Sequence, residues 1–108
     1  MKLVWLPVGL FLFCAQAFAS EITFENKLFE GKKTWLPKLT EVAAGKTTLK
    51  IVNTLAEPHG FNIPGIADSL VIQPNETKVV KDVVLKAGKY PVNCQMHPAH
   101  VGAEIVVK

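Results

Sequence analysis

Arginine is absent from this sequence, and its 12 basic residues are all lysine. Nucleic-acid-binding proteins commonly use the planar fork of arginine on phosphates and base edges, within a clustered basic surface. Neither feature is present, and the net charge is only +3. We therefore expect no nucleic-acid partner, although the lysines leave a weak attraction to an acidic protein open.

Cysteine is nearly absent as well, and one of the two cysteines falls in a segment that we expect to be removed. An apolar run from Leu3 to Phe13 includes no charge and is followed by small residues at Ala17 and Ala19. This pattern predicts a secretory signal peptide over residues 1–19, cut before Ser20, and export to the periplasm. The run is too short to span a bilayer, so we expect no stable membrane insertion after cleavage.

Residues 20–108 then form one domain, expected to be monomeric, in which Cys94 is the only cysteine. An internal disulfide is excluded in such a domain. A small domain often needs a disulfide or a metal to reinforce its core. A lone thiol in an oxidising compartment is a liability unless the protein uses it. Cys94 is therefore the first candidate for chemistry.

Helical periodicity is scarce in this domain, whereas short alternating segments separated by glycine and proline are frequent. Alternation or a short apolar run predicts strands over residues 21–25, 39–42, 47–54, 70–72, 78–85, 90–94 and 103–107. An eighth extended segment lies within residues 57–65, while Pro37 argues against a central strand at its position. Seven or eight short strands predict an all-β fold, an antiparallel β-sandwich.

The three histidines and Cys94 have a spacing that suggests a metal site. His97 and His100 follow Cys94 by three and six residues, and His59 stands 35 residues before it. A strand that ends at Cys94 and continues into a tight loop can turn His97 back toward the sulfur. Each residue alone is more commonly a core or loop residue. Together they offer thiolate and imidazole ligands, which suit copper and also zinc.

Three segments resemble the cupredoxin family: Pro58–Gly65, Pro74–Thr77 and Ala87–Val107. The resemblance implies a Greek-key sandwich that holds one type 1 copper ion, cycling between Cu(II) and Cu(I). It implies His59, Cys94 and His97 as the three equatorial ligands. It also implies one-electron transfer to a redox partner protein and no enzymatic activity.

The chain departs from the family where an axial methionine is common, because His100 stands there, before Val101 and Gly102. We expect His100 to be the axial ligand, with Met96 or no strong axial ligand as alternatives and Glu57 as a more distant candidate. Imidazole is a harder donor than thioether sulfur and stabilises Cu(II). An axial His100 therefore predicts a lower reduction potential and a green or red copper centre.

Two other functions remain open at this stage. A nitrogen-rich site also suits periplasmic copper sequestration, delivery or tolerance, in which the partner is a copper-handling protein. Catalysis at copper needs a vacant position, which four protein ligands would fill. Asn53 and Asn93 are candidates to hydrogen-bond the loop that carries Cys94.

Overall fold

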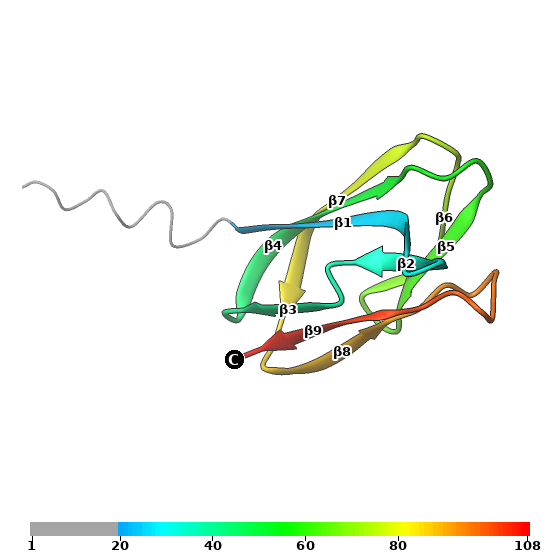
Figure 1. Ribbon diagram of the computed structural model, residues 1–108. Coiled ribbons are helices and arrows are strands. Elements are labelled where there is room, and N and C mark those ends of the chain that lie inside the picture. Colours follow the sequence, from blue (N-terminus) through cyan, green and yellow to red (C-terminus); the bar gives the residue numbers. More distant parts are fainter. Residues whose placement is uncertain (1–19) are drawn as a thin grey trace, which may run out of the picture.

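Nine β-strands make up the part of the chain that the structure, a computed structural model, describes: residues 20–108 (Figure 1). The predicted signal peptide, residues 1–19, lies outside this range and stays a prediction. Between residues 20 and 108, no helix long and apolar enough to cross a membrane is found. The strands are β1 (Ser20–Phe29), β2 (Lys32–Leu36), β3 (Leu39–Val42), β4 (Gly45–Asn53), β5 (His59–Ile63), β6 (Ala67–Ile72), β7 (Thr77–Leu85), β8 (Gly88–Val92) and β9 (Ala103–Val107).

The strands form two layers and a hairpin. One sheet has the order β2-β1-β4-β7, the other has the order β3-β9-β8, and β5 pairs with β6 (Figure 1). The predicted all-β sandwich is confirmed. Two details differ from the prediction: there are nine strands, and the pairs β1–β4 and β3–β9 are parallel.

The path of the chain after β1 accounts for the additional strand and for the parallel pairing of β1 with β4. The additional strand is β2, which ends at Leu36, directly before the proline that excludes a longer strand. After β2 the chain crosses to the second sheet as β3 and then returns as β4 beside β1. A connection that leaves the sheet and comes back allows β1 and β4 to run in the same direction.

The core lies between the layers and follows the alternation of the strands. Alternate side chains of β1 and β4 point inward, and they meet inward side chains of β8 and β9. Trp35 and Phe61 pack edge to face with ring centroids 5.1 Å apart, and Phe24 lies 5.3 Å from Phe61. The fully buried apolar residues are Phe24, Trp35, Leu49, Ile51, Phe61, Ile63, Ile72, Val92 and Ile105.

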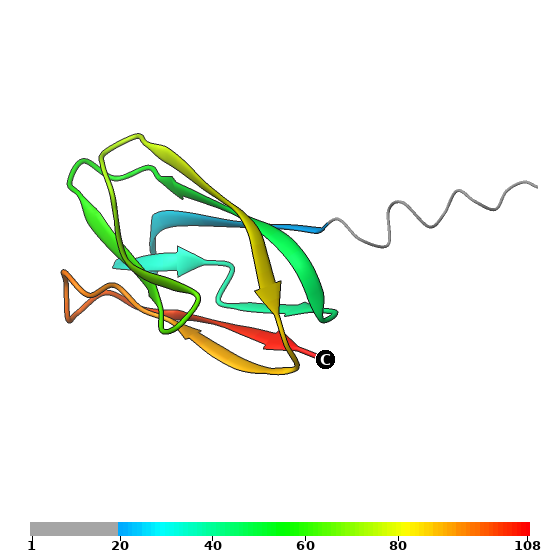
Figure 2. The ribbon, with the colours of Figure 1, turned by 180° about the vertical axis from the view of Figure 1, so that it is seen from behind.

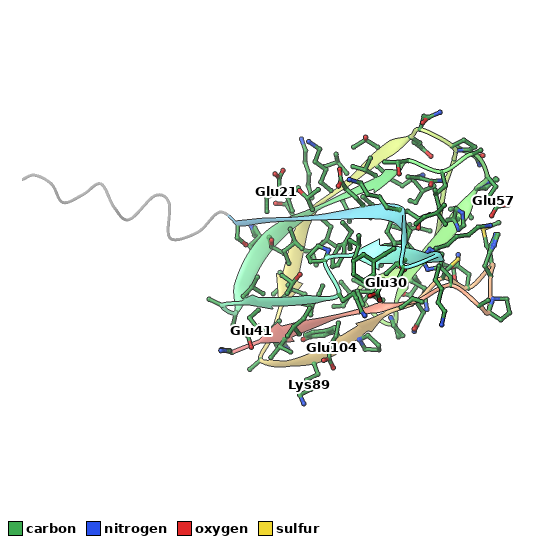
Figure 3. The ribbon with its side chains drawn as sticks, viewed as in Figure 1. Glu21, Glu30, Glu41, Glu57, Lys89 and Glu104 are labelled. Atoms are coloured by element: carbon green, nitrogen blue, oxygen red, sulfur yellow. The ribbon has the colours of Figure 1, made fainter. Side chains whose placement is uncertain are left out.

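The loop between β8 and β9 lies at the end of the sandwich opposite the C-terminus, and the view from behind shows the same arrangement (Figures 1 and 2). The β5–β6 hairpin lies at this end too. Glu57 is found here, whereas Glu21 and Glu41 lie toward the other end (Figure 3). Segments far apart in the sequence therefore converge at this loop, which carries Cys94, His97 and His100.

Candidate metal centre

Three of the four predicted ligands converge. One ligand atom each from His59, Cys94 and His97 lies within 4.8 Å of the other two. His59 is the first residue of β5 and is fully buried, Cys94 follows β8 and is 8% exposed, and His97 lies in the loop. Atoms this close can surround a single metal ion.

Backbone hydrogen bonds fix both ends of the loop. At the first end, Asn93 and Asn62 exchange two N–H···O bonds of 2.7 and 2.9 Å. At the second end, Val101 N donates to Lys33 O over 2.9 Å, and Trp35 N donates to Val101 O over 3.2 Å. The loop is thus held between β5 and β2, so the positions of its side chains follow from the sandwich.

Gly60 supplies a hydrogen bond to the sulfur. Its N–H donates to Cys94 Sγ over 3.1 Å, and its carbonyl accepts a 3.0 Å bond from Trp35 Nε1. The side-chain amide of Gln95 occupies the space where a Cβ at Gly60 would lie, and Gln95 Nε2 donates to Leu70 O over 2.9 Å. An N–H directed at the sulfur holds the Cys94 side chain in place as a candidate metal ligand.

Three buried imidazole nitrogens are left without a hydrogen bond. Within residues 20–108, Nδ1 and Nε2 of His59 and Nε2 of His97 have no partner. A buried polar atom without a partner costs about 1–3 kcal/mol, so such atoms usually have a function. Coordination would satisfy these nitrogens, and thiolate with two imidazoles is a donor set that fits copper or zinc.

The electrostatic environment of His59 keeps its ring neutral, which is the form that binds a metal. Burial, and after it the positive charges of His100, His97 and Lys33, together lower the pKa of His59 to about 4. At neutral pH the ring is therefore uncharged. The ring nitrogen that carries no hydrogen can therefore bind a metal without first losing a proton.

His100 lies beside the cluster but is turned away from it. Its ring centroid is 5.2 Å from that of His59. Its nitrogens face oxygen atoms instead, with Nε2 at 2.6 Å from Asn26 Oδ1 and Nδ1 at 3.0 Å from Val101 O. Burial lowers the pKa of His100, while its bond to Val101 O acts in the opposite direction. An axial role for His100 stays a prediction.

The other two candidates for the fourth position are Met96 and Glu57. Met96 is 43% exposed. Glu57 forms an ion pair with Lys33, and its Oε1 lies 3.5 Å from His59 Nε2. The carboxylate therefore neighbours the ring of His59 and stands outside the group of three ligand atoms.

The two asparagines expected to support the Cys94 loop have different roles. Asn93 acts through its backbone bonds to Asn62. Asn53 is fully buried, and its Nδ2 donates to the carbonyls of Glu57, Ile72 and Gln73 over 2.8, 3.0 and 3.3 Å. It therefore holds the segment that leads into His59.

Sequence reasoning missed Asn26, Gly60 and Gln95. Asn26 had a detectable signal, because the alternation of β1 places it on the same inward face as Ile22 and Phe24. A polar residue at such a position needs a buried partner. Gly60 and Gln95 gave no comparable signal, since only the folded chain brings them together.

His97 connects the cluster to the surface. It is partly exposed and lines a pocket of about 280 Å³ together with Gly31, Lys32, Lys33, Ala99 and His100. Lys32 brings a positive charge to this pocket, whereas the charge of Lys33 is compensated by its ion pair with Glu57.

Comparisons with known proteins agree with this fold. The sequence model of the family described as the cupredoxin-like domain matches residues 3–107. No curated protein sequence matches the chain at a significant level. The chain is similar in structure to auracyanin A, a blue copper protein from Chloroflexus aurantiacus, with a TM-score of 0.63 and 17% identity, covering 83% of this chain and 99% of that one.

Two further structures extend the comparison. A reduced, singly substituted amicyanin has a TM-score of 0.60 and 18% identity, with coverage of 82% of this chain and 83% of that one. A blue copper oxidase from Nitrosomonas europaea has a TM-score of 0.64 and 15% identity, covering 83% of this chain and only 39% of the oxidase. Because the sequence identities are 15–18%, these similarities show that the fold is shared and nothing beyond it.

Proposed function

The chain belongs to the family of cupredoxin-like domains, and on that premise we propose that it is an exported copper protein that carries single electrons. The observation that supports this most strongly is the convergence of His59, Cys94 and His97, whose ligand atoms lie within 4.8 Å of one another. The unpartnered nitrogens of the two histidines add to it. The similar small proteins auracyanin A and amicyanin are consistent with such a carrier.

Copper, when bound, supplies the Cu(II)/Cu(I) couple. The chain supplies a fixed set of donors: His59 as a neutral imidazole held in the core, and Cys94 with the Gly60 N–H directed at its sulfur. Because backbone bonds fix the loop at both ends, the donors need to move little when the charge on the site changes. A small rearrangement favours fast electron exchange.

We propose that electrons enter and leave at His97, because this ligand is partly exposed at a surface pocket. A redox partner protein would dock on the loop around Pro98, and Lys32 would favour an acidic group on that partner. We propose a carrier and not an enzyme, acting as a monomer in the periplasm after removal of residues 1–19.

His100 is our candidate for a weak fourth ligand. Its ring lies next to that of His59, which places a third imidazole at the edge of the site. Binding to copper would require its ring to leave the oxygens of Asn26 and Val101.

Metal analysis joined to visible spectroscopy and electrochemistry tests the proposal. The purified protein should hold one copper ion per chain, show a sulfur-to-copper charge-transfer band and cycle reversibly between two oxidation states. Zinc as the retained metal, or copper bound without a visible band, would overturn the proposal.

Copper sequestration or delivery is the second candidate function. The observation that favours it is the nitrogen-rich surrounding of the sulfur, since imidazoles stabilise Cu(II). The two functions differ in rates. A carrier exchanges electrons with small redox reagents faster than it loses copper to a chelator, whereas a delivery protein releases copper readily and exchanges electrons slowly.

A further inference from the structure

A buried chain of polar side chains leads from the interior of the sandwich to His100. Asn26, on β1, is fully buried, and its Nδ2 donates to Asn53 Oδ1 over 3.2 Å. Its Oδ1 lies 2.6 Å from His100 Nε2. Its backbone carbonyl accepts bonds from Thr54 N and Thr54 Oγ1, at 3.3 and 2.6 Å. Asn26 is therefore fixed at both its backbone and its side chain.

The orientation of both amides follows from their partners. Asn53 Nδ2 faces three backbone carbonyls, which can only accept hydrogen bonds, so the nitrogen of Asn53 must lie there. Its Oδ1 then accepts from Leu55 N and from Asn26 Nδ2. Because the nitrogen of Asn26 is used in this way, its oxygen is the atom that faces His100.

An amide oxygen can only accept, so the hydrogen in the contact with Asn26 belongs to His100 Nε2. A neutral imidazole carries one N–H, and the Val101 carbonyl that faces Nδ1 at 3.0 Å can also only accept. We assign the hydrogen to Nε2 because its contact is the shorter of the two. While that N–H remains on Asn26, the ring cannot turn toward the cluster. Trp35 packs against the ring at 5.6 Å between centroids and further limits its motion.

We propose that Asn26 is a positioning residue that competes with copper for His100 and keeps the fourth ligand weak. This inference rests on the proposed copper site. The Asn26–His100 bond leaves the site close to three-coordinate, dominated by His59, Cys94 and His97. Loss of the bond allows His100 to coordinate strongly, which moves the site toward a tetragonal geometry.

The substitution Asn26→Leu tests this proposal, because leucine has a similar volume and no acceptor. Asn53 Oδ1 keeps its bond from Leu55 N in the variant. Copper-loaded Asn26→Leu should shift toward larger copper hyperfine splitting in its electron paramagnetic resonance spectrum and toward a lower reduction potential. Asn26→Asp keeps an acceptor for His100, so its copper spectrum should stay close to that of the wild type, whereas its stability should fall because aspartate cannot donate to Asn53 Oδ1. Asn26→Ser, which is too short to reach His100, replaces the leucine variant if that variant does not fold.

His100→Leu provides the matched control, because leucine cannot bind copper. Combined with Asn26→Leu, it should remove the spectral shift that Asn26→Leu produces alone. The metal-free protein gives a readout independent of copper: a slowly exchanging Nε2–H of His100 in nitrogen–proton NMR spectra, lost in Asn26→Leu.

The results of these experiments distinguish the role of Asn26 from copper binding itself. An unchanged copper spectrum in Asn26→Leu, or a shift that persists in the double variant, overturns the role of Asn26 and leaves the copper site intact. An unprotected Nε2–H in the metal-free wild type also overturns it. Absence of copper binding in the wild type overturns both proposals.

Discussion

Two groups of polar residues are buried at the loop end of the sandwich, and they differ in how their hydrogen bonds are satisfied. In the network of Asn26, Asn53 and His100, every side chain has close partners. In the ligand cluster, three imidazole nitrogens of His59 and His97 have none within residues 20–108. Each group includes fully buried side chains, Asn26 and Asn53 in the network and His59 in the cluster, so burial alone does not distinguish them.

The difference indicates what each group does. A satisfied buried network stabilises one arrangement of the chain. An unsatisfied group costs free energy in the folded protein, and a metal ion is the partner that this donor set fits. Substitutions in the network should therefore change stability and geometry, whereas substitutions in the cluster should change metal binding.

The largest effect is expected from Cys94→Ser. Loss of the thiolate should abolish the visible charge-transfer band and weaken copper binding by more than about 100-fold, since even indirect support of a metal ligand is worth 10–100-fold. Competition with a chelator of known affinity measures the change. Met96→Leu is the control: it should leave both the band and the affinity unchanged, and a loss in that variant would make Met96 a ligand.

Acid should destabilise the metal-free protein through the cluster. The pKa of His59 is about 4 in the folded chain and near 6.5 when it is unfolded, so the unfolded state binds more protons between these values. This contribution to stability is present above pH 6.5 and is lost as the pH falls, by about 3 kcal/mol at pH 4. His100, whose pKa is also lowered, acts in the same direction.

Urea unfolding of the metal-free protein across this pH range measures the loss. His59→Gln should flatten the dependence, because the residue with the largest shift is removed. A wild type as stable at pH 4 as at pH 7 would contradict the buried neutral state of His59.

Asn53→Ala, in the network of Asn26, Asn53 and His100, should lower the unfolding free energy of the protein. The change removes the Nδ2 donor from the carbonyls of Glu57 and Ile72, while the carbonyl of Gln73 keeps its bond from Glu76 N. We expect a loss of about 2–3 kcal/mol in unfolding free energy. Thermal and urea unfolding measure it with and without copper. Asn93→Ala, at an exposed side chain, should cost less than about 0.5 kcal/mol. Equal losses of stability in the two variants would contradict the role of Asn53 in holding the segment that leads into His59.

The smallest effects come from a pair of glycines beside the loop. A Cβ at Gly102 would overlap the backbone carbonyl of Val92, which cannot move easily, so Gly102→Ala should cost about 2 kcal/mol. A Cβ at Gly60 would overlap the end of the Gln95 side chain, which can swing outward at a cost of about 1 kcal/mol or less. Unfolding measurements that reverse this order would contradict the packing described for the loop.

The strands could be predicted from the sequence because alternation is a local signal, as in residues 47–54, which contain most of β4. The parallel pairing of β1 with β4 could not, since it depends on the detour of the chain through β3 in the other sheet. Pairing between distant segments leaves no local pattern.

The same distinction applies to the site. Cys94, His97 and His59 carried a ligand spacing, and the structure brings them together. The orientation of His100 depends on Asn26, 74 residues away in the chain, so no spacing near Cys94 could reveal it.

Copper K-edge X-ray absorption of the copper-loaded protein tests the common coordination of His59, Cys94 and His97 most directly. We expect one sulfur and two imidazole nitrogens at bonding distance, with the sulfur lost in Cys94→Ser and one imidazole lost in His59→Gln. A copper environment of nitrogen and oxygen alone, unchanged by Cys94→Ser, would show that the metal binds elsewhere.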